Sequence, residues 1–158
     1  PQRVMRRRAG RPLAAALLLW AQAAGAGTLT VETAEGAVLM TARAPEGAEW
    51  CLTWNHSVTG GHVADCFVNR EGRMILARSY LHDFSAGLGE VEGRGGRLVS
   101  APGGGYWLED IDDAIEGNAL PVRIGRPSTD HRLSVGGRQH RLSPRAAGQR
   151  VHLVLTPE

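Results

Sequence analysis

Residues 50–68 read WCLTWNHSVTGGHVADCFV, and this stretch predicts a β-hairpin. Apolar and polar residues alternate on both sides of the Gly60-Gly61 pair, as they do in half-buried strands. Two adjacent glycines accept the positive φ angles that a two-residue hairpin turn requires. We therefore expect Thr59 to lie opposite His62, with one strand before the turn and one after it.

This register predicts which side chains meet across the hairpin. It places His56 opposite Asp65 and Trp54 opposite Phe67. The carboxylate would then orient the imidazole and raise its pKa. Three interpretations of the His–Asp pair remain open: a structural hydrogen bond, a ligand contact in a cleft, or a catalytic or metal-binding pair. Ser57 is expected on the opposite face of the strand, which argues against a Ser–His dyad.

The two cysteines, Cys51 and Cys66, conflict with this register. An even cysteine count in an exported chain favours a disulfide. The tight turn instead offsets them by about 13 Å, beyond the ~7 Å between Cα atoms that a bridge allows. Either a wide loop over roughly residues 56–64 joins the strands, or the cysteines are free and buried. The cysteine count favours the disulfide and weakens the prediction of a His56–Asp65 pair.

The rest of the chain carries the same β-rich pattern. Short β-branched and aromatic runs are bounded by Gly, Pro, Asn and Asp. Strands are expected at residues 28–33, 37–43, 49–58, 62–69, 73–84, 106–111, 120–124, 131–135, 139–142 and 150–155, with one helical turn at 146–148. A length of 158 residues suits one domain. We therefore predict an all-β fold, a mainly antiparallel β-sandwich or barrel-like domain.

The N-terminus has the pattern of a secretory signal peptide. Five arginines and no acidic residue lie within residues 1–26, followed by a short apolar run and the small-residue site Ala24-Gly25-Ala26. We predict a signal peptide over 1–26 and a single β-rich domain over 27–158, exported to the periplasm or secreted. The apolar run is too short for an uncleaved membrane anchor, and no stable membrane span is expected after signal cleavage.

Charge excludes one class of partner. The chain has 18 basic residues, all arginine, 16 acidic residues and a net charge of +2. Removal of five arginines with the signal peptide leaves 13 against 16 acidic residues, a net charge of −3. The exported domain therefore has no electrostatic reason to bind nucleic acid.

A second candidate site edge follows the strand expected at residues 73–84. His82-Asp83 comes at its end, and eight glycines fall between residues 85 and 105. A long glycine-rich stretch predicts either a mobile functional loop or a packed Ω-type loop. Asp83 could equally bind turn amides. No local zinc motif or cofactor motif occurs, so no cofactor is expected. A non-local metal site that combines His56, His82 and His131 with Asp65 or Asp83 stays open.

Several of these motifs, in their order and spacing, resemble the family called domain of unknown function 1850. The resemblance is carried by Trp54-Asn-His56-Ser57-Val58, Asp65, Phe84-Ser-Ala-Gly87-Leu-Gly89, Leu120-Pro-Val-Arg123-Ile-Gly125, Asp130-His131-Arg-Leu133 and Leu142-Ser143. The family positions that match this sequence are Trp54, His56, Ser57, Asp65, Phe84, Gly87, Gly89, Arg123 and His131. The cysteines lie outside the general pattern.

The resemblance implies an exported bacterial protein whose genes often neighbour those of tripartite periplasmic transporters of the TAXI type. We therefore expect a non-enzymatic accessory or binding module associated with such a transporter. The alternative is a hydrolase or metal-dependent enzyme that uses the same His and Asp residues. The candidate binding residues are the nine family positions together with His82 and Asp83; no residue is assigned a catalytic role.

Overall fold

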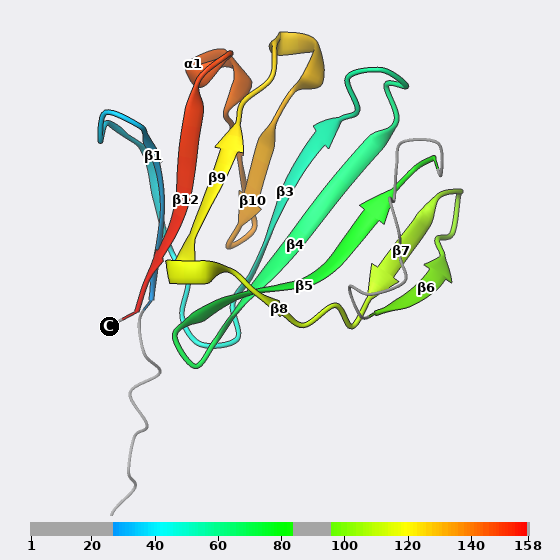
Figure 1. Ribbon diagram of the computed structural model, residues 1–158, viewed down its shortest axis with the longest axis horizontal. Coiled ribbons are helices and arrows are strands. Elements are labelled where there is room, and N and C mark those ends of the chain that lie inside the picture. The colour runs from blue at the N-terminus through cyan, green and yellow to red at the C-terminus, as the bar shows by residue number, and fades with distance from the viewer. Residues whose placement is uncertain (1–26, 84–95, 158) are drawn as a thin grey trace, which may run out of the picture.

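The computed structural model describes residues 27–83 and 96–157, which form two antiparallel β-sheets packed face to face (Figure 1). The smaller sheet contains, in spatial order, β2 (Val38–Arg43), β1 (Thr28–Thr33), β12 (Arg150–Thr156) and β9 (Ala119–Arg123). The larger sheet contains β11 (Arg138–Arg141), β10 (Arg132–Val135), β3 (Glu49–Asn55), β4 (His62–Arg70), β5 (Arg73–Leu81), β7 (Tyr106–Glu109) and β6 (Arg97–Ser100), and β8 (Asp113–Ala114) pairs with β5. The all-β prediction is confirmed, and because the sheets do not close into a barrel, the sandwich form is the correct one.

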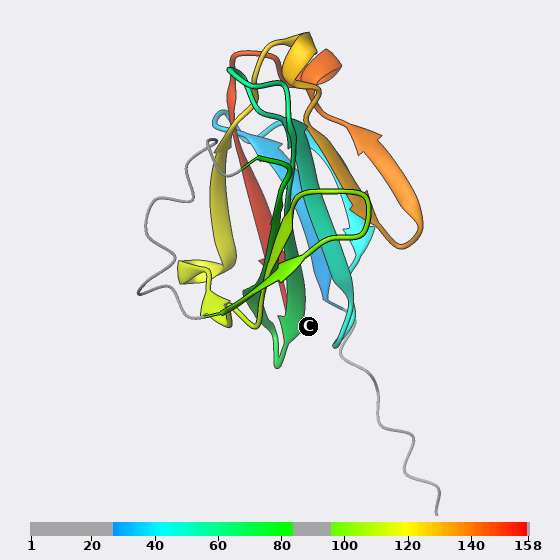
Figure 2. The same cartoon turned by 90° about the vertical axis from the view of Figure 1, so that its right-hand side faces the viewer.

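The core lies between the two sheets, which Figure 2 shows edge-on. Alternate residues of each strand point inward, as the two-residue period of a strand requires. In β1 the buried residues include Leu29 and Val31, and in β12 they are Val151, Leu153 and Leu155. The larger sheet contributes mainly Trp50, Leu52, Phe67, Met74, Leu133 and Val135. This apolar layer fixes which face of each strand is available for a site.

The predicted tight turn between β3 and β4 is wrong. The last pair of the ladder is Asn55 opposite His62, so residues 56–61 form a six-residue connection. The His56 side chain explains the wider loop, because its Nδ1 accepts hydrogen bonds from the backbone N–H groups of Val58 and Thr59. Of the two glycines, only Gly60 has a positive φ, whereas the predicted turn type needs both.

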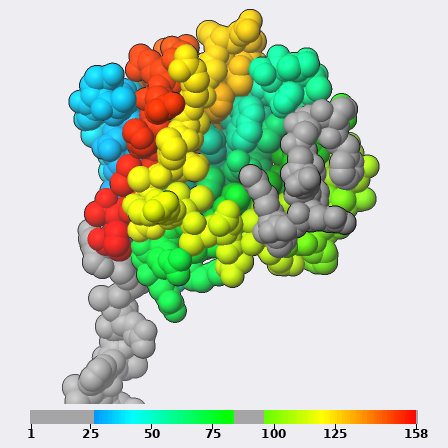
Figure 3. All heavy atoms as spheres, viewed as in Figure 1, coloured from blue at the N-terminus to red at the C-terminus, as the bar shows by residue number. Residues whose placement is uncertain are grey.

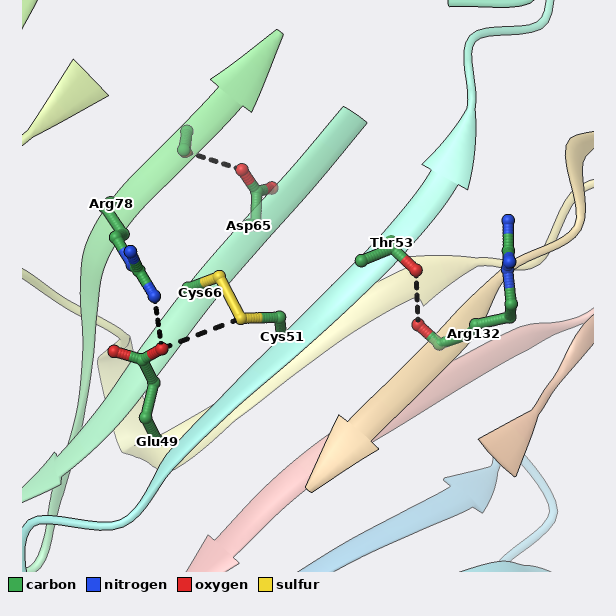
Figure 4. Close-up of a disulfide and its surroundings, with 8 residues drawn as sticks. Glu49, Cys51, Thr53, Asp65, Cys66, Arg78 and Arg132 are labelled. Atoms are coloured by element: carbon green, nitrogen blue, oxygen red, sulfur yellow. Dashed lines mark hydrogen bonds and ion pairs between the residues drawn. A yellow bond between two sulfur atoms is a disulfide. The ribbon is translucent and has the colours of Figure 1, made fainter. Parts of the chain in front are cut away.

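The wider loop moves the register and allows the predicted disulfide, which is confirmed. Cys51 lies directly opposite Cys66, with a Cα–Cα distance of 4.1 Å and a bond between the sulfur atoms (Figure 4). The aromatic pair shifts with the register: Phe67 lies opposite Trp50 rather than Trp54, with ring centroids 6.3 Å apart. Asp65 lies opposite Leu52, so the predicted His56–Asp65 pair is wrong.

Most other predicted strands are confirmed within a few residues. β6 and β8 were not expected, because β6 falls in the glycine-rich stretch and β8 has only two residues. The helical turn α1 is Ser143–Ala146, earlier than predicted, and two short 3-10 turns, η2 (Glu116–Asn118) and η3 (Pro127–Thr129), complete the fold. The predicted signal peptide lies outside the described residues. Among those residues, no helix has the length and apolar character to cross a membrane.

Candidate functional site

A groove of about 710 Å³ opens at one end of the sandwich, where the β3–β4 loop meets the segment after β9. Figure 3 shows these two segments, teal and gold, near each other along the upper edge. Their meeting follows from the topology, since β3 and β9 belong to opposite sheets and end at the same side. The groove is lined by Trp54, His56, Ser57, Arg123, Ile124, Gly125, Arg126, Thr129, His131 and Gly148.

A second hollow of about 330 Å³ adjoins this groove along the β3–β4 loop. The two hollows share His56, Ser57, Arg126 and Thr129 in their linings. The two hollows are therefore continuous, and we call the larger one, with its ten lining residues, the end groove. Its size is in the range of small-molecule sites in proteins, roughly 300–1,000 Å³.

Close packing around Gly125 holds the floor of the end groove. A Cβ atom on Gly125 would lie 2.6 Å from Thr129 Oγ1 and 2.8 Å from Thr129 Cβ. Ser143 joins the same packing, because its hydroxyl accepts the backbone N–H of His131 and donates to the carbonyl of Gly125. These contacts hold the segment from Ile124 to His131 against α1, so this wall of the groove has a defined conformation.

His131 is the most buried titratable group of the groove, with 7% of its surface exposed. Its ring stacks on Trp54, with centroids 5.7 Å apart and an interplanar angle of 9°. Burial lowers the pKa of His131, and the charge of neighbouring Asp130 offsets part of that effect. Nδ1 accepts the backbone N–H of Gly125 at 3.2 Å, which places the proton of the neutral ring on Nε2.

His56 is held in the same way on the other wall. Its Nδ1 accepts from Val58 N–H at 3.4 Å and from Thr59 N–H at 3.3 Å. Its backbone N–H donates to Gly61, and its carbonyl accepts from Gly60. The neutral His56 ring therefore also carries its proton on Nε2. Within the part of the chain that the structure describes, neither Nε2 atom has a hydrogen-bond partner.

Two arginines make the end groove cationic. Arg123 and Arg126 are exposed, and neither forms an ion pair with another described residue. The closest acidic neighbour in sequence, Asp130, is already paired with Arg132 and Arg141. No carboxylate stands among the residues that line the groove. The surface therefore presents positive charge and N–H donors together.

Five of the predicted site residues come together in the end groove: Trp54, His56, Ser57, Arg123 and His131. Asp65 does not join them; its carboxylate accepts the Ser79 hydroxyl at 2.6 Å instead. His82 and Asp83 follow β5 and are not in the groove lining. The His82 backbone N–H donates to the carbonyl of His62. Phe84, Gly87 and Gly89 lie outside the described residues.

The other five lining residues were not among the predicted site residues: Ile124, Gly125, Arg126, Thr129 and Gly148. Arg126 directly follows the Arg123–Gly125 segment and precedes Pro127, which begins η3. Its position in a loop that follows a strand is the one sequence signal for it, because binding residues are concentrated in loops held by a rigid scaffold. Thr129 could not be found this way, because its role depends on contact with Gly125, which only the fold reveals.

One group among the described residues has metal-ligand geometry: Glu49, Cys51 and Cys66. Both sulfur atoms are joined in the disulfide (Figure 4), so they offer no thiolate to a metal ion. Glu49 Oε1 is itself bound by Arg78 at 2.6 Å. The non-local metal site suggested by the sequence does not assemble either, since no group of three ligands among the described residues contains a histidine.

Comparisons with known proteins now bear on this arrangement. Searches of the curated proteins and of the solved structures return no match to this chain. A family model described as domain of unknown function (DUF1850) matches residues 51–142, which include all the lining residues of the end groove except Gly148. A match over more than half of the chain shows the family, and the protein belongs to the DUF1850 family.

Proposed function

We propose that this protein is a non-enzymatic binding module that acts as an accessory to a tripartite periplasmic solute transporter of the TAXI type. The observation that supports a binding role most strongly is the end groove, where five residues that match the family pattern meet from both sheets. The transporter association rests on the family resemblance. The proposed periplasmic or secreted location rests on the N-terminal sequence and agrees with a disulfide.

A binding role fits the chemistry of the groove better than catalysis does. A hydrolase needs a nucleophile within hydrogen-bond reach of a base. Ser57 lies beside His56 in sequence, but His56 Nδ1 is already an acceptor for two backbone amides. No carboxylate of the groove lining is available to orient either imidazole as in a catalytic triad. The alternative, a hydrolase or metal-dependent enzyme, therefore has no supporting pair of groups in the groove.

Co-purification and uptake in the native host test this proposal. The tagged chain is expressed in a strain whose own copy is deleted, and the envelope is cross-linked before purification. We expect enrichment of the transporter's membrane and solute-binding components, and loss of uptake in the deletion strain. The wild-type chain should restore uptake, and so should the control Arg138→Ala/Arg145→Ala, which changes two exposed arginines outside the groove.

The groove variant Arg123→Ala/Arg126→Ala should restore no more than a small part of the uptake. Uptake that is unchanged by deletion, with no transporter component above background, would contradict the accessory role. Tight zinc binding or hydrolysis that disappears with His56→Ala would support the enzyme alternative instead.

A further inference from the structure

Resting on the proposed binding role, we infer that the end groove binds the carboxylate of a small organic solute. Arg123 and Arg126 supply the positive charge, and the Nε2–H groups of His56 and His131 supply neutral hydrogen-bond donors. The charge, the orientation of the two imidazoles, and the apolar part of the lining each support this assignment independently.

The charge of the lining selects an anion. Two arginines face the groove without an acidic partner among the described residues, while the nearby acid Asp130 is bound by Arg132 and Arg141. A guanidinium presents a planar fork of N–H donors that matches the two oxygens of a carboxylate. A cationic solute would meet two like charges and no carboxylate.

The imidazoles add donors rather than acceptors. Each Nδ1 is fixed as an acceptor of a backbone amide, from Gly125 in one wall and from Val58 and Thr59 in the other. Each neutral ring can therefore only donate through its remaining nitrogen. A ligand that meets both rings must bring acceptor atoms, which a carboxylate has and an ammonium group lacks.

The backbone argues against an inorganic oxyanion. Phosphate and sulfate sites commonly use a series of free backbone N–H groups in a turn or at a helix end. Here the amides of Val58, Thr59 and Gly125 are already used by the imidazoles. The amides of Thr129 and Gly148 are also engaged, by backbone carbonyls, so side chains supply most of the donors available to a ligand.

The remaining lining suits a carbon skeleton. Trp54 is partly buried and its ring is stacked on His131, so it offers accessible apolar surface in the lining, whereas Ile124 is fully buried in the core below. A volume of about 710 Å³ exceeds what a bare ion needs and accommodates an organic molecule. A carboxylate attached to a small apolar or planar body would use both parts of the groove.

Isothermal titration calorimetry on the purified, disulfide-bonded exported domain tests the inference. The probes are succinate, glutamate and benzoate, with the uncharged succinamide and inorganic phosphate as comparisons. We expect at least one carboxylate to bind, and added salt to weaken it, because the attraction is electrostatic. Succinamide should bind at least tenfold more weakly than succinate or not at all.

Matched variants test whether the carboxylate binds in the end groove. Arg123→Gln/Arg126→Gln should weaken the carboxylate at least tenfold, and Arg138→Gln/Arg145→Gln should leave it unchanged. Equal weakening by the two variants would overturn the inference, as would binding of phosphate in preference to every carboxylate. If no carboxylate binds while the chain still co-purifies with the transporter, the ligand assignment fails and the proposed function stands.

Discussion

Removal of the Cys51–Cys66 disulfide should lower the stability of the domain by an amount set by the loop it closes. The two cysteines are separated by 15 residues in the sequence. In the chain-entropy account, a cross-link over a loop of this length stabilises the folded state by about 3 kcal/mol. The double variant Cys51→Ala/Cys66→Ala removes the cross-link without leaving a free thiol, and alanine introduces no polar group at the buried Cys66 position.

Urea unfolding followed by tryptophan fluorescence measures this loss. For a domain of about 130 residues, 3 kcal/mol corresponds to a fall of roughly 11 °C in the melting temperature. The same loss should follow when the wild-type protein is reduced with dithiothreitol, and the double variant should not respond to the reductant. The m-value should rise, because the unfolded chain without the cross-link is less compact and exposes more surface.

The reasoning would be refuted by a double variant within 0.5 kcal/mol of wild type, a margin of roughly the size of ordinary surface changes. It would also be refuted by intact mass spectrometry that finds two free thiols in the unreduced protein. Either result would mean that the cross-link does not supply the stability predicted from its loop length.

Two further predictions concern the floor of the end groove. Gly125→Ala should cost about 1–3 kcal/mol in urea unfolding, because the new Cβ would lie 2.6–2.9 Å from three Thr129 atoms. Thr129→Ala in that background removes two of those atoms and should recover part of the loss; a fully stable Gly125→Ala would contradict the packing. Burial lowers the pKa of His131, so the unfolded chain takes up a proton first and stability should fall as the pH drops below about 6.5. His131→Asn, which keeps an acceptor for Gly125 N–H, should show a shallower fall between pH 7 and pH 5, and an equally steep fall would show that other groups cause it.

The strands could be predicted from the sequence because each one satisfies a local rule. Residues 28–33 alternate inward and outward positions, and β1 occupies the same six residues. The register of β3 and β4 could not be predicted in this way. It depends on a side chain, His56, that binds the amides of its own loop and so displaces the turn from the glycine pair. The one local sign of the wider loop is that the tight turn would hold Cys51 and Cys66 too far apart for a disulfide.

The candidate site was predictable in part, because short local motifs mark some of its residues. Short motifs marked Trp54, His56, Ser57, Arg123 and His131, and the fold brings these five to one groove. Their meeting depends on two sheets ending at the same side of the sandwich, which no single segment reveals. Asp65 was placed beside His56 only by the wrong register, and it contacts Ser79 instead.

The central claim is that the end groove holds two imidazoles as Nε2–H donors for a bound carboxylate. A long-range proton–nitrogen NMR spectrum of the ¹⁵N-labelled protein at mildly alkaline pH reads the tautomer of each histidine directly. We predict that His56 and His131 both carry the proton on Nε2, and that succinate or another binding carboxylate shifts these two rings but not His140 or His152. A proton on Nδ1 of either groove histidine, or a carboxylate that binds without moving either ring, would contradict the account.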